Sequence, residues 1–251
     1  MGRLGLRGFL AHLSYVYEGA SKLMGLAAAV LTLIDMGSIL STMPYVTGAP
    51  SPSSSPIFFM ASMVLALYSL SMVYSFLSEL ESGHAAFFLS HPLSPLGYVM
   101  SWVIACVALP SAVYALCIAA SVAIIDPRLL PSIATKEVAY SVLEVAIATL
   151  LSFLVGMGFK RRSVGFAAWV FTYLLAPFLI PIVAMLVTGS LSPPDEALLI
   201  ASILAPYKYY TMFAHSAYNI SEAAVALSST VLVVCLVGAI AVYARAVFEV
   251  S

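Results

Sequence analysis

Two carboxylates stand inside long apolar runs of this sequence, where a charged group is costly. Asp35 interrupts the run Leu23–Leu40, and Glu144 interrupts the run Val138–Phe159. A charge at mid-bilayer depth costs about 2.5–3.5 kcal/mol on insertion scales, so each side chain is expected to face protein or water. Either residue could line a polar path or carry protons. Alternatively, both lie near the outer ends of their helices and reach the interface. Neither has an obvious basic partner within the apolar runs.

The most unusual polar stretch is Ser78–Tyr98, which reads SELESGHAAFFLSHPLSPLGY. Acidic residues suit the first turn of a helix and prolines stop one, so Glu79 and Glu81 are expected to open a short helix here. Most helix–helix links have about 2–8 residues, and this one is much longer. Its polar side chains either dock on a partner or simply keep the loop hydrated. His84 and His91 have no evident third ligand beside them, so no metal site is predicted.

The composition of the chain and the length of its apolar runs predict a membrane protein. The chain has 251 residues, of which 63% are hydrophobic and 8% are charged, whereas soluble domains have about 25% charged residues. Six runs meet or approach the length of about 20 residues that crosses a bilayer. They are 23–40, 57–77, 99–125, 138–159, 164–187 and 223–243. The predicted fold class is all-α, a single polytopic domain over 1–251 with about six transmembrane helices.

Charge and cysteine usage exclude other classes of protein. The net charge of −1 argues against a nucleic-acid-binding surface. The three cysteines lie inside apolar runs, without a second Cys or a His at metal-ligand spacing, so neither a zinc site nor a disulfide framework is predicted.

The placement of Lys and Arg predicts the orientation, because these residues concentrate on the cytoplasmic side. With six spans, one side holds Arg3, Arg7, Lys22, Lys160, Arg161, Arg162 and Arg245, and the other holds Arg128, Lys136 and Lys208. The sequence therefore predicts a multi-pass protein of the cell membrane with both termini in the cytoplasm.

Three further segments have irregular patterns. The segment 196–219 is interrupted by Pro206, and two short helices that dip into the outer leaflet fit it better than a seventh span. Met1–Leu23 has apolar residues three and four apart, which favours an amphipathic helix on the cytoplasmic membrane surface over a frayed tail. Pro177 and Pro181, one turn apart in the fifth run, predict a kink that either shapes a cavity or serves packing alone.

The connection after the second run resembles that of the permease subunits of type-2 ATP-binding cassette (ABC) exporters. In that family the segment commonly reads acidic, Gly, an apolar pair, then Pro-apolar-Ser, with an aromatic or aliphatic residue beginning the third span. The matching residues are Glu79, Glu81, Gly83, Phe88, Leu89, Pro92, Leu93, Ser94 and Tyr98. The sequence departs from the pattern at Pro95, where many members have a basic residue, and at Ser101–Trp102, where many have a Lys. The resemblance covers most of the chain as architecture but only this segment as a motif.

The resemblance implies that the segment is a coupling helix that docks on an ATP-binding subunit through the matching residues and His84. That subunit would bind ATP and Mg and hydrolyse the ATP, so no catalytic residue or cofactor is expected in this chain. The permease would pair with a second copy or a homologue among membrane lipids. The residues expected along the translocation path are Asp35, Glu144, Pro177 and Pro181, with an amphipathic or lipid-like substrate. Rival hypotheses are a proton- or ion-coupled secondary transporter that uses Asp35 or Glu144, an intramembrane enzyme, and a membrane assembly factor.

Overall fold

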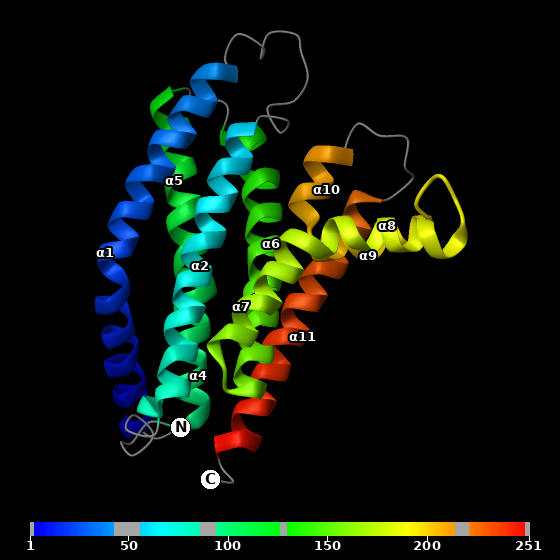
Figure 1. The fold of residues 1–251 in the computed structure, drawn as a ribbon. Coiled ribbons are helices and arrows are strands. Elements are labelled where there is room, and N and C mark those ends of the chain that lie inside the picture. Colours follow the sequence, from blue (N-terminus) through cyan, green and yellow to red (C-terminus); the bar gives the residue numbers. More distant parts are fainter. Residues whose placement is uncertain (1–2, 43–55, 86–93, 126–129, 214–220, 249–251) are drawn as a thin grey trace.

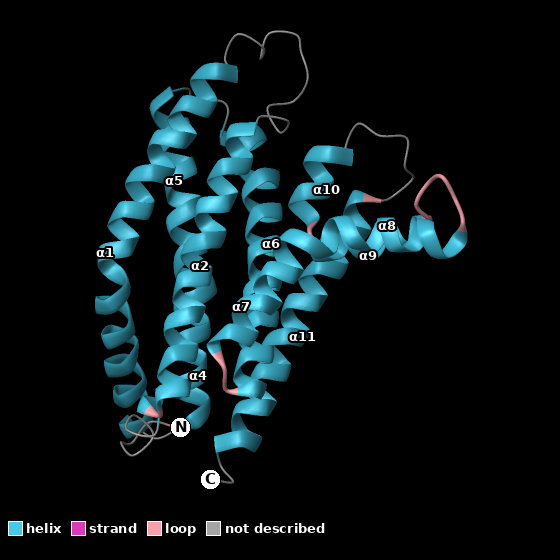
Figure 2. Cartoon of the chain, in the orientation of Figure 1, coloured by secondary structure: helices cyan, strands magenta, loops and turns pink. Residues whose placement is uncertain are grey.

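The computed structural model describes residues 3–42, 56–85, 94–125, 130–213 and 221–248. Within these ranges the chain is a bundle of helices with short turns and no strand (Figures 1 and 2). The elements are α1 (Arg3–Thr42), α2 (Pro56–Ser82), α4 (Pro95–Val103), η3 (Ile104–Ala108), α5 (Leu109–Ile125), α6 (Leu130–Phe159), α7 (Arg162–Val170), η5 (Phe171–Leu175), α8 (Ala176–Thr188), α9 (Asp195–Leu204), α10 (Pro206–Phe213) and α11 (Glu222–Phe248). The prediction of an all-helical protein is confirmed.

Five segments among the described residues are long and apolar enough to cross a membrane. They are Ala61–Ser82, Pro95–Ser121, Val138–Phe159, Arg162–Thr188 and Glu222–Ala246. Each overlaps one of the predicted runs, so the chain has the character of a multi-pass membrane protein. The first predicted run, 23–40, lies inside α1 and is not one of the five.

The first 42 residues differ from expectation in one respect. The sequence pattern predicts a surface helix followed by a separate span, whereas α1 runs without a break through both as a single helix of 40 residues. A helix of this length extends about 60 Å. Prolines are absent between Arg3 and Thr42, so nothing in the backbone forces a turn near Leu23. The side chains of Val16 and Leu31, on either side of the expected boundary, are both buried.

The helices α2 and α6 form the centre of the bundle. About 61% of the residues in the apolar windows of both helices are buried, against 22% for α11 and for the α7–α8 segment. The rings of Phe76 and Phe153 stack at 4.0 Å between α2 and α6. Gly156 and Gly165 let α6 and α7 approach closely, and the hydroxyl of Ser152 donates to the carbonyl of Gly165 at 2.6 Å.

Two π-helical segments stand just before prolines. The N–H of Leu109 bonds to the carbonyl of Ile104, and that of Ala176 bonds to the carbonyl of Phe171, so each segment contains one residue more than an α-turn. Pro110 and Pro177 follow at once; each lacks an N–H and would crowd the preceding turn of an uninterrupted α-helix. The predicted kink in the fifth run is present: after η5 the chain turns, and α8 runs across the bundle rather than along it (Figure 1).

The segment after α8 returns to the bundle as two short helices. Gly189, in the left-handed region at φ 65°, ends α8. The helices α9 and α10 have 10 and 8 residues, separated by Ala205 at φ −134° and ψ 63°. Neither is long enough to cross a bilayer. The C-terminal part of the predicted outer segment, from residue 214, lies outside the described residues.

The close approach of α6 and α7 predicts a size limit at Gly165. A Cβ there would meet a methyl group of Leu77 and would lie 3.2 Å from the backbone oxygen of Ser152. We expect Gly165→Ala to lower the free energy of unfolding by about 1–3 kcal/mol, as overpacking does. The matched control is Gly238→Ala in α11, where nothing lies within 4 Å of the added methyl group. Thermal unfolding in detergent measures both, and equal stability of the two variants would contradict the packing described.

Candidate functional site

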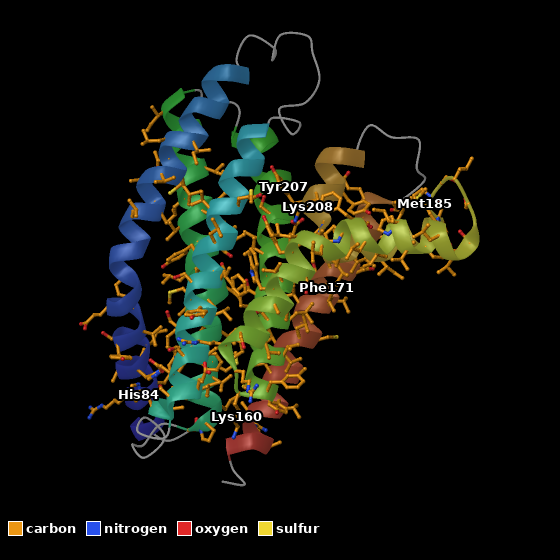
Figure 3. All side chains as sticks on the ribbon, in the orientation of Figure 1. His84, Lys160, Phe171, Met185, Tyr207 and Lys208 are labelled. Carbon is orange, nitrogen blue, oxygen red and sulfur yellow. The ribbon has the colours of Figure 1, made fainter. Side chains whose placement is uncertain are left out.

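A buried ion pair joins α6 to α10. Glu144 of α6 and Lys208 of α10 are 1% and 3% exposed. The Lys208 ammonium contacts one oxygen of the Glu144 carboxylate, and the backbone N–H of Lys208 donates to the other at 3.0 Å. Figure 3 labels Lys208 beside Tyr207, where α10 meets the bundle. Both charged groups are therefore buried, and each neutralises the other.

The remaining contacts of the ammonium come from Tyr173 in η5. Lys208 Nζ donates to the Tyr173 carbonyl at 2.6 Å and lies 3.7 Å from the centre of its ring. The Tyr173 ring stacks on Trp169, with centroids 4.7 Å apart. A carboxylate, a carbonyl and an aromatic face are together the groups that stabilise an ammonium away from water.

The prolines predicted to kink this helix explain why its carbonyls accept from side chains. Pro177 has no N–H to donate to the carbonyl four residues earlier, that of Tyr173, and Pro181 likewise has none for the carbonyl of Pro177. Lys208 donates to the first carbonyl, and the hydroxyl of Tyr209 donates to the second at 3.2 Å. Two consecutive residues of α10 therefore satisfy both carbonyls.

Glu144 also caps α10. A helix begins with N–H groups that have no partner within it, and a carboxylate near them is stabilising. Lys208 is the third residue of α10, and its N–H bonds to Glu144 from the neighbouring helix. On the other side of the break, the hydroxyl of Ser229 in α11 donates to the carbonyl of Ile203 at 2.9 Å. The interrupted backbone of α9–α10 is thus satisfied by side chains of the bundle.

Further polar side chains surround the ion pair. The hydroxyl of Tyr114 in α5 donates to Ser141 at 3.3 Å, and that of Tyr140 in α6 donates to Glu222 in α11 at 3.2 Å. The large side chains of Tyr173 and Tyr207 are fully buried. This part of the bundle therefore has four tyrosines within its apolar core cluster, Tyr114, Tyr140, Tyr173 and Tyr207, in addition to the two buried charges.

No basic partner for Glu144 was expected within the apolar runs, and the partner that the structure shows lies outside them, in the short helix α10. The predicted outer segment 196–219 contains Lys208, which together with Pro206 and His215 interrupts its apolar pattern. The structure brings residues 64 positions apart into contact. The signal that could have found the pair is that Lys208, like Glu144, stands among large apolar and aromatic residues. A charge in such a setting requires a counter-charge.

Helix α2 ends and α4 begins at the end of the bundle where both termini lie (Figure 1), and these helix ends carry the described docking residues. Glu79 and Glu81 were expected to begin the coupling helix at Ser78, but α2 continues to Ser82, so they form its last turn. Gly83, at φ 77°, follows directly. His84 is exposed and is labelled at this end in Figure 3.

The far side of this connection also differs from the prediction. Pro95, one of the prolines expected to stop the coupling helix, instead begins α4 as its first helical residue, and the hydroxyl of Ser94 caps that helix by accepting from the N–H of Gly97 at 3.0 Å. Phe88, Leu89, Pro92 and Leu93, together with His91, lie outside the described residues. Of the predicted path residues, Asp35 lies in α1, and its side chain is not among those described.

Two polar contacts fasten the end of α2. The hydroxyl of Tyr98 in α4 donates to Glu79 at 2.9 Å, and Arg162 at the start of α7 pairs with Glu81 at 3.2 Å. The guanidinium of Arg162 also lies 5.3 Å from the ring centre of Tyr74. The side chains of Arg162 and Glu81 are about half exposed, so this pair contributes about 0–1 kcal/mol.

His12 of α1 connects the N-terminal segment to the same end. It is buried, its ring packs 4.9 Å from that of Tyr98, and its Nδ1 lies 2.6 Å from the hydroxyl of Ser101. Ser101 donates its only hydroxyl proton to the Tyr98 carbonyl at 2.7 Å, so Nδ1 of His12 must be the donor in the bond to Ser101. Burial disfavours the charged form and lowers the pKa of His12 to about 4, so the imidazole is neutral at pH 7.

Comparison of the chain with known protein families and with curated protein sequences finds no match.

Loss of one partner of the Glu144–Lys208 pair predicts a large loss of stability. Glu144→Gln leaves a buried ammonium without its counter-charge, and we expect the free energy of unfolding to fall by about 3–5 kcal/mol. The double variant Glu144→Gln/Lys208→Met should be more stable than the sum of the two single changes implies. Thermal unfolding in detergent measures this cycle. Glu81→Gln, which breaks a half-exposed pair, is the control, and additive effects at Glu144 and Lys208 would contradict a coupled pair.

The buried neutral His12 predicts a pH dependence of stability. Its pKa is about 4 in the folded chain and about 6.5 in an unfolded one, so the unfolded state binds more protons between these values. Stability is therefore complete above pH 6.5 and declines as the pH falls towards 4. His12→Phe keeps a ring beside Tyr98 but cannot titrate, so its stability should fall less over this range. Unfolding measured from pH 7 to 4 tests this, and parallel curves for the two proteins would exclude His12 as the cause.

Proposed function

We propose that this chain is the permease subunit of an ATP-driven exporter, of the type that the sequence resembles. The observation that carries the proposal is the connection between α2 and α4, which joins the apolar segments Ala61–Ser82 and Pro95–Ser121 at the end of the bundle that also contains both termini. Such a connection offers an ATP-binding partner a place to push on two helices at once. That end would face the cytoplasm of a cell-membrane protein.

The contacts at this end support a mechanical role. Tyr98–Glu79 ties α4 to α2, Arg162–Glu81 ties α2 to α7, and His12–Ser101 ties α1 to α4. A displacement of the segment after Gly83 would therefore reach four helices. The partner would bind ATP and Mg and hydrolyse the ATP, while this chain would transmit the motion and enclose the substrate path.

Exposed apolar side chains suit a second permease copy or homologue and the surrounding lipid. The α7–α8 segment and α11 are the least covered of the five apolar segments. Large side chains exposed on them include Phe171, Leu175, Phe178, Ile182, Leu186, Leu227, Val231, Val234 and Val242. An apolar outside and a core with tyrosines around an ion pair fit transport of an amphipathic substrate better than transport of a strongly hydrated one.

A second candidate is an ion-coupled secondary transporter, and the Glu144–Lys208 pair favours it. An ionisable pair inside a membrane helix bundle is a common site of ion or proton coupling. This mechanism needs no ATPase, so transport in vesicles that contain the purified chain alone would support it. Transport that requires an added ATP-binding subunit and ATP would support the exporter.

The docking proposal is tested by association with an ATP-binding cassette protein encoded beside this chain. We expect Glu81→Ala to weaken co-purification by about tenfold or more, since a charged hydrogen bond contributes about 1.5–3 kcal/mol. Arg162→Ala breaks the same internal ion pair but leaves Glu81 free to dock, so it is the matched control. ATP turnover by the complex is the second measurement. Undiminished association and turnover in the Glu81 variant would contradict docking at this site.

A further inference from the structure

The groups around the Lys208 ammonium are arranged as in a cation-binding site, and the cation is a side chain of the same protein. The ammonium contacts three acceptors: the Glu144 carboxylate, the Tyr173 carbonyl and the face of the Tyr173 ring. All of these acceptors come from α6 and η5. The cation alone comes from α10, so the site and its occupant belong to different elements.

The acceptor side holds its shape through contacts that do not involve Lys208. Glu144 lies in the interior of α6, the most covered of the helices together with α2. The Tyr173 ring is fixed against Trp169, and its carbonyl lacks the α-helical donor because Pro177 has no N–H. Without Lys208, a buried negative charge and an unsatisfied carbonyl would remain side by side, and this arrangement attracts a cation that has N–H donors.

The Lys208 side chain is carried by a short helix that is separate from the helices providing the acceptors. α10 has eight residues and is separated from α9 by the break at Ala205. Lys208 and Tyr209 hydrogen-bond it to α6 and η5–α8, and the fully buried Tyr207 packs in the same core cluster as Tyr140 and Trp169. A movement of α10 away from α6 would separate the ammonium from Glu144 and from the Tyr173 carbonyl together, because the same group makes both contacts.

We propose that Glu144 and Tyr173 form a binding site for the primary ammonium group of an organic cation, which Lys208 occupies in this conformation. A ligand of this class displaces Lys208, and α10 then withdraws from α6. The inference names a substrate class for the proposed transport path and to that extent rests on the proposed function. The site can be tested without an ATP-binding subunit, so failure here leaves the docking proposal standing, and failure of docking leaves this site standing.

The first experiment replaces the occupant. Lys208→Ala removes the atoms of n-propylammonium, so the purified variant is titrated with that ion while its thermal unfolding is followed. We expect Tm to rise with saturation, by about 3–6 °C at ten times the dissociation constant. Neutral 1-propanol and tetramethylammonium, which has no N–H, should give no such rise. The rise should also be absent from Glu144→Gln/Lys208→Ala. If Lys208→Ala does not fold by itself, it is expressed and purified with n-propylammonium present throughout. Recovery of folded protein with this ion and not with 1-propanol supports the site, and no recovery with either overturns it.

The second experiment asks whether a ligand displaces Lys208 in the unaltered protein. Amide hydrogen exchange of residues 206–213 is measured with and without n-propylammonium. We expect exchange in the wild-type chain to increase with the ion and not with 1-propanol, whereas exchange in Lys208→Ala should decrease because the ion restores the contact. No ammonium-specific rise in Tm would overturn the site. A rise in the variant with unchanged exchange in the wild-type chain would overturn displacement and leave a purely structural ion pair.

Discussion

The contact between the Glu144 carboxylate and the Lys208 ammonium is the interaction on which one half of this bundle depends. Each charge alone would be costly among apolar helices, and neither side chain reaches water, because both are almost fully covered. The pair requires α10 to lie against α6. It also requires η5 to bring the Tyr173 carbonyl within 2.6 Å of the ammonium. The placement of three elements therefore follows from the need to neutralise two charges.

The prolines and the polar side chains of this region form one arrangement. A helix interrupted inside a membrane must satisfy the backbone groups it frees, because lipid offers no hydrogen bonds. Pro177 and Pro181 each withhold a donor, and Lys208 and Tyr209 each supply one. The break at Ala205 leaves backbone groups on α9 and α10, and Ser229 and Glu144 bond to them. The bend in the fifth apolar segment and the short helices after it therefore depend on each other, because side chains of α10 satisfy the carbonyls that the prolines free.

The two ends of the bundle are held by contacts of different strength. The Glu144–Lys208 pair is buried, and breaking such a pair costs about 3–5 kcal/mol. The Arg162–Glu81 pair is half exposed and contributes about 0–1 kcal/mol. A region that must follow the motion of a partner is better served by weak, reversible contacts, whereas a site that must remain closed until a ligand arrives is better served by strong ones. This contrast fits the proposed division between a docking end and a substrate site.

The amino-acid sequence by itself determined the helical class, the apolar segments and the kink, because these depend on local properties: run length, hydropathy and the missing N–H of proline. It also placed Glu144 and the prolines among the residues of interest. The partner of Glu144 and the unbroken course of α1 past Leu23 were decided only by the tertiary structure. A charge pair between residues 144 and 208 produces no periodic pattern in the sequence, because it depends on how helices distant in the chain pack together. The helix ends near Ser82 and Ser94 do have local signals, Gly83 after the first and a capping Ser followed by Pro95 at the second, but the prediction assigned Pro95 to the end of a helix rather than to the start of the next.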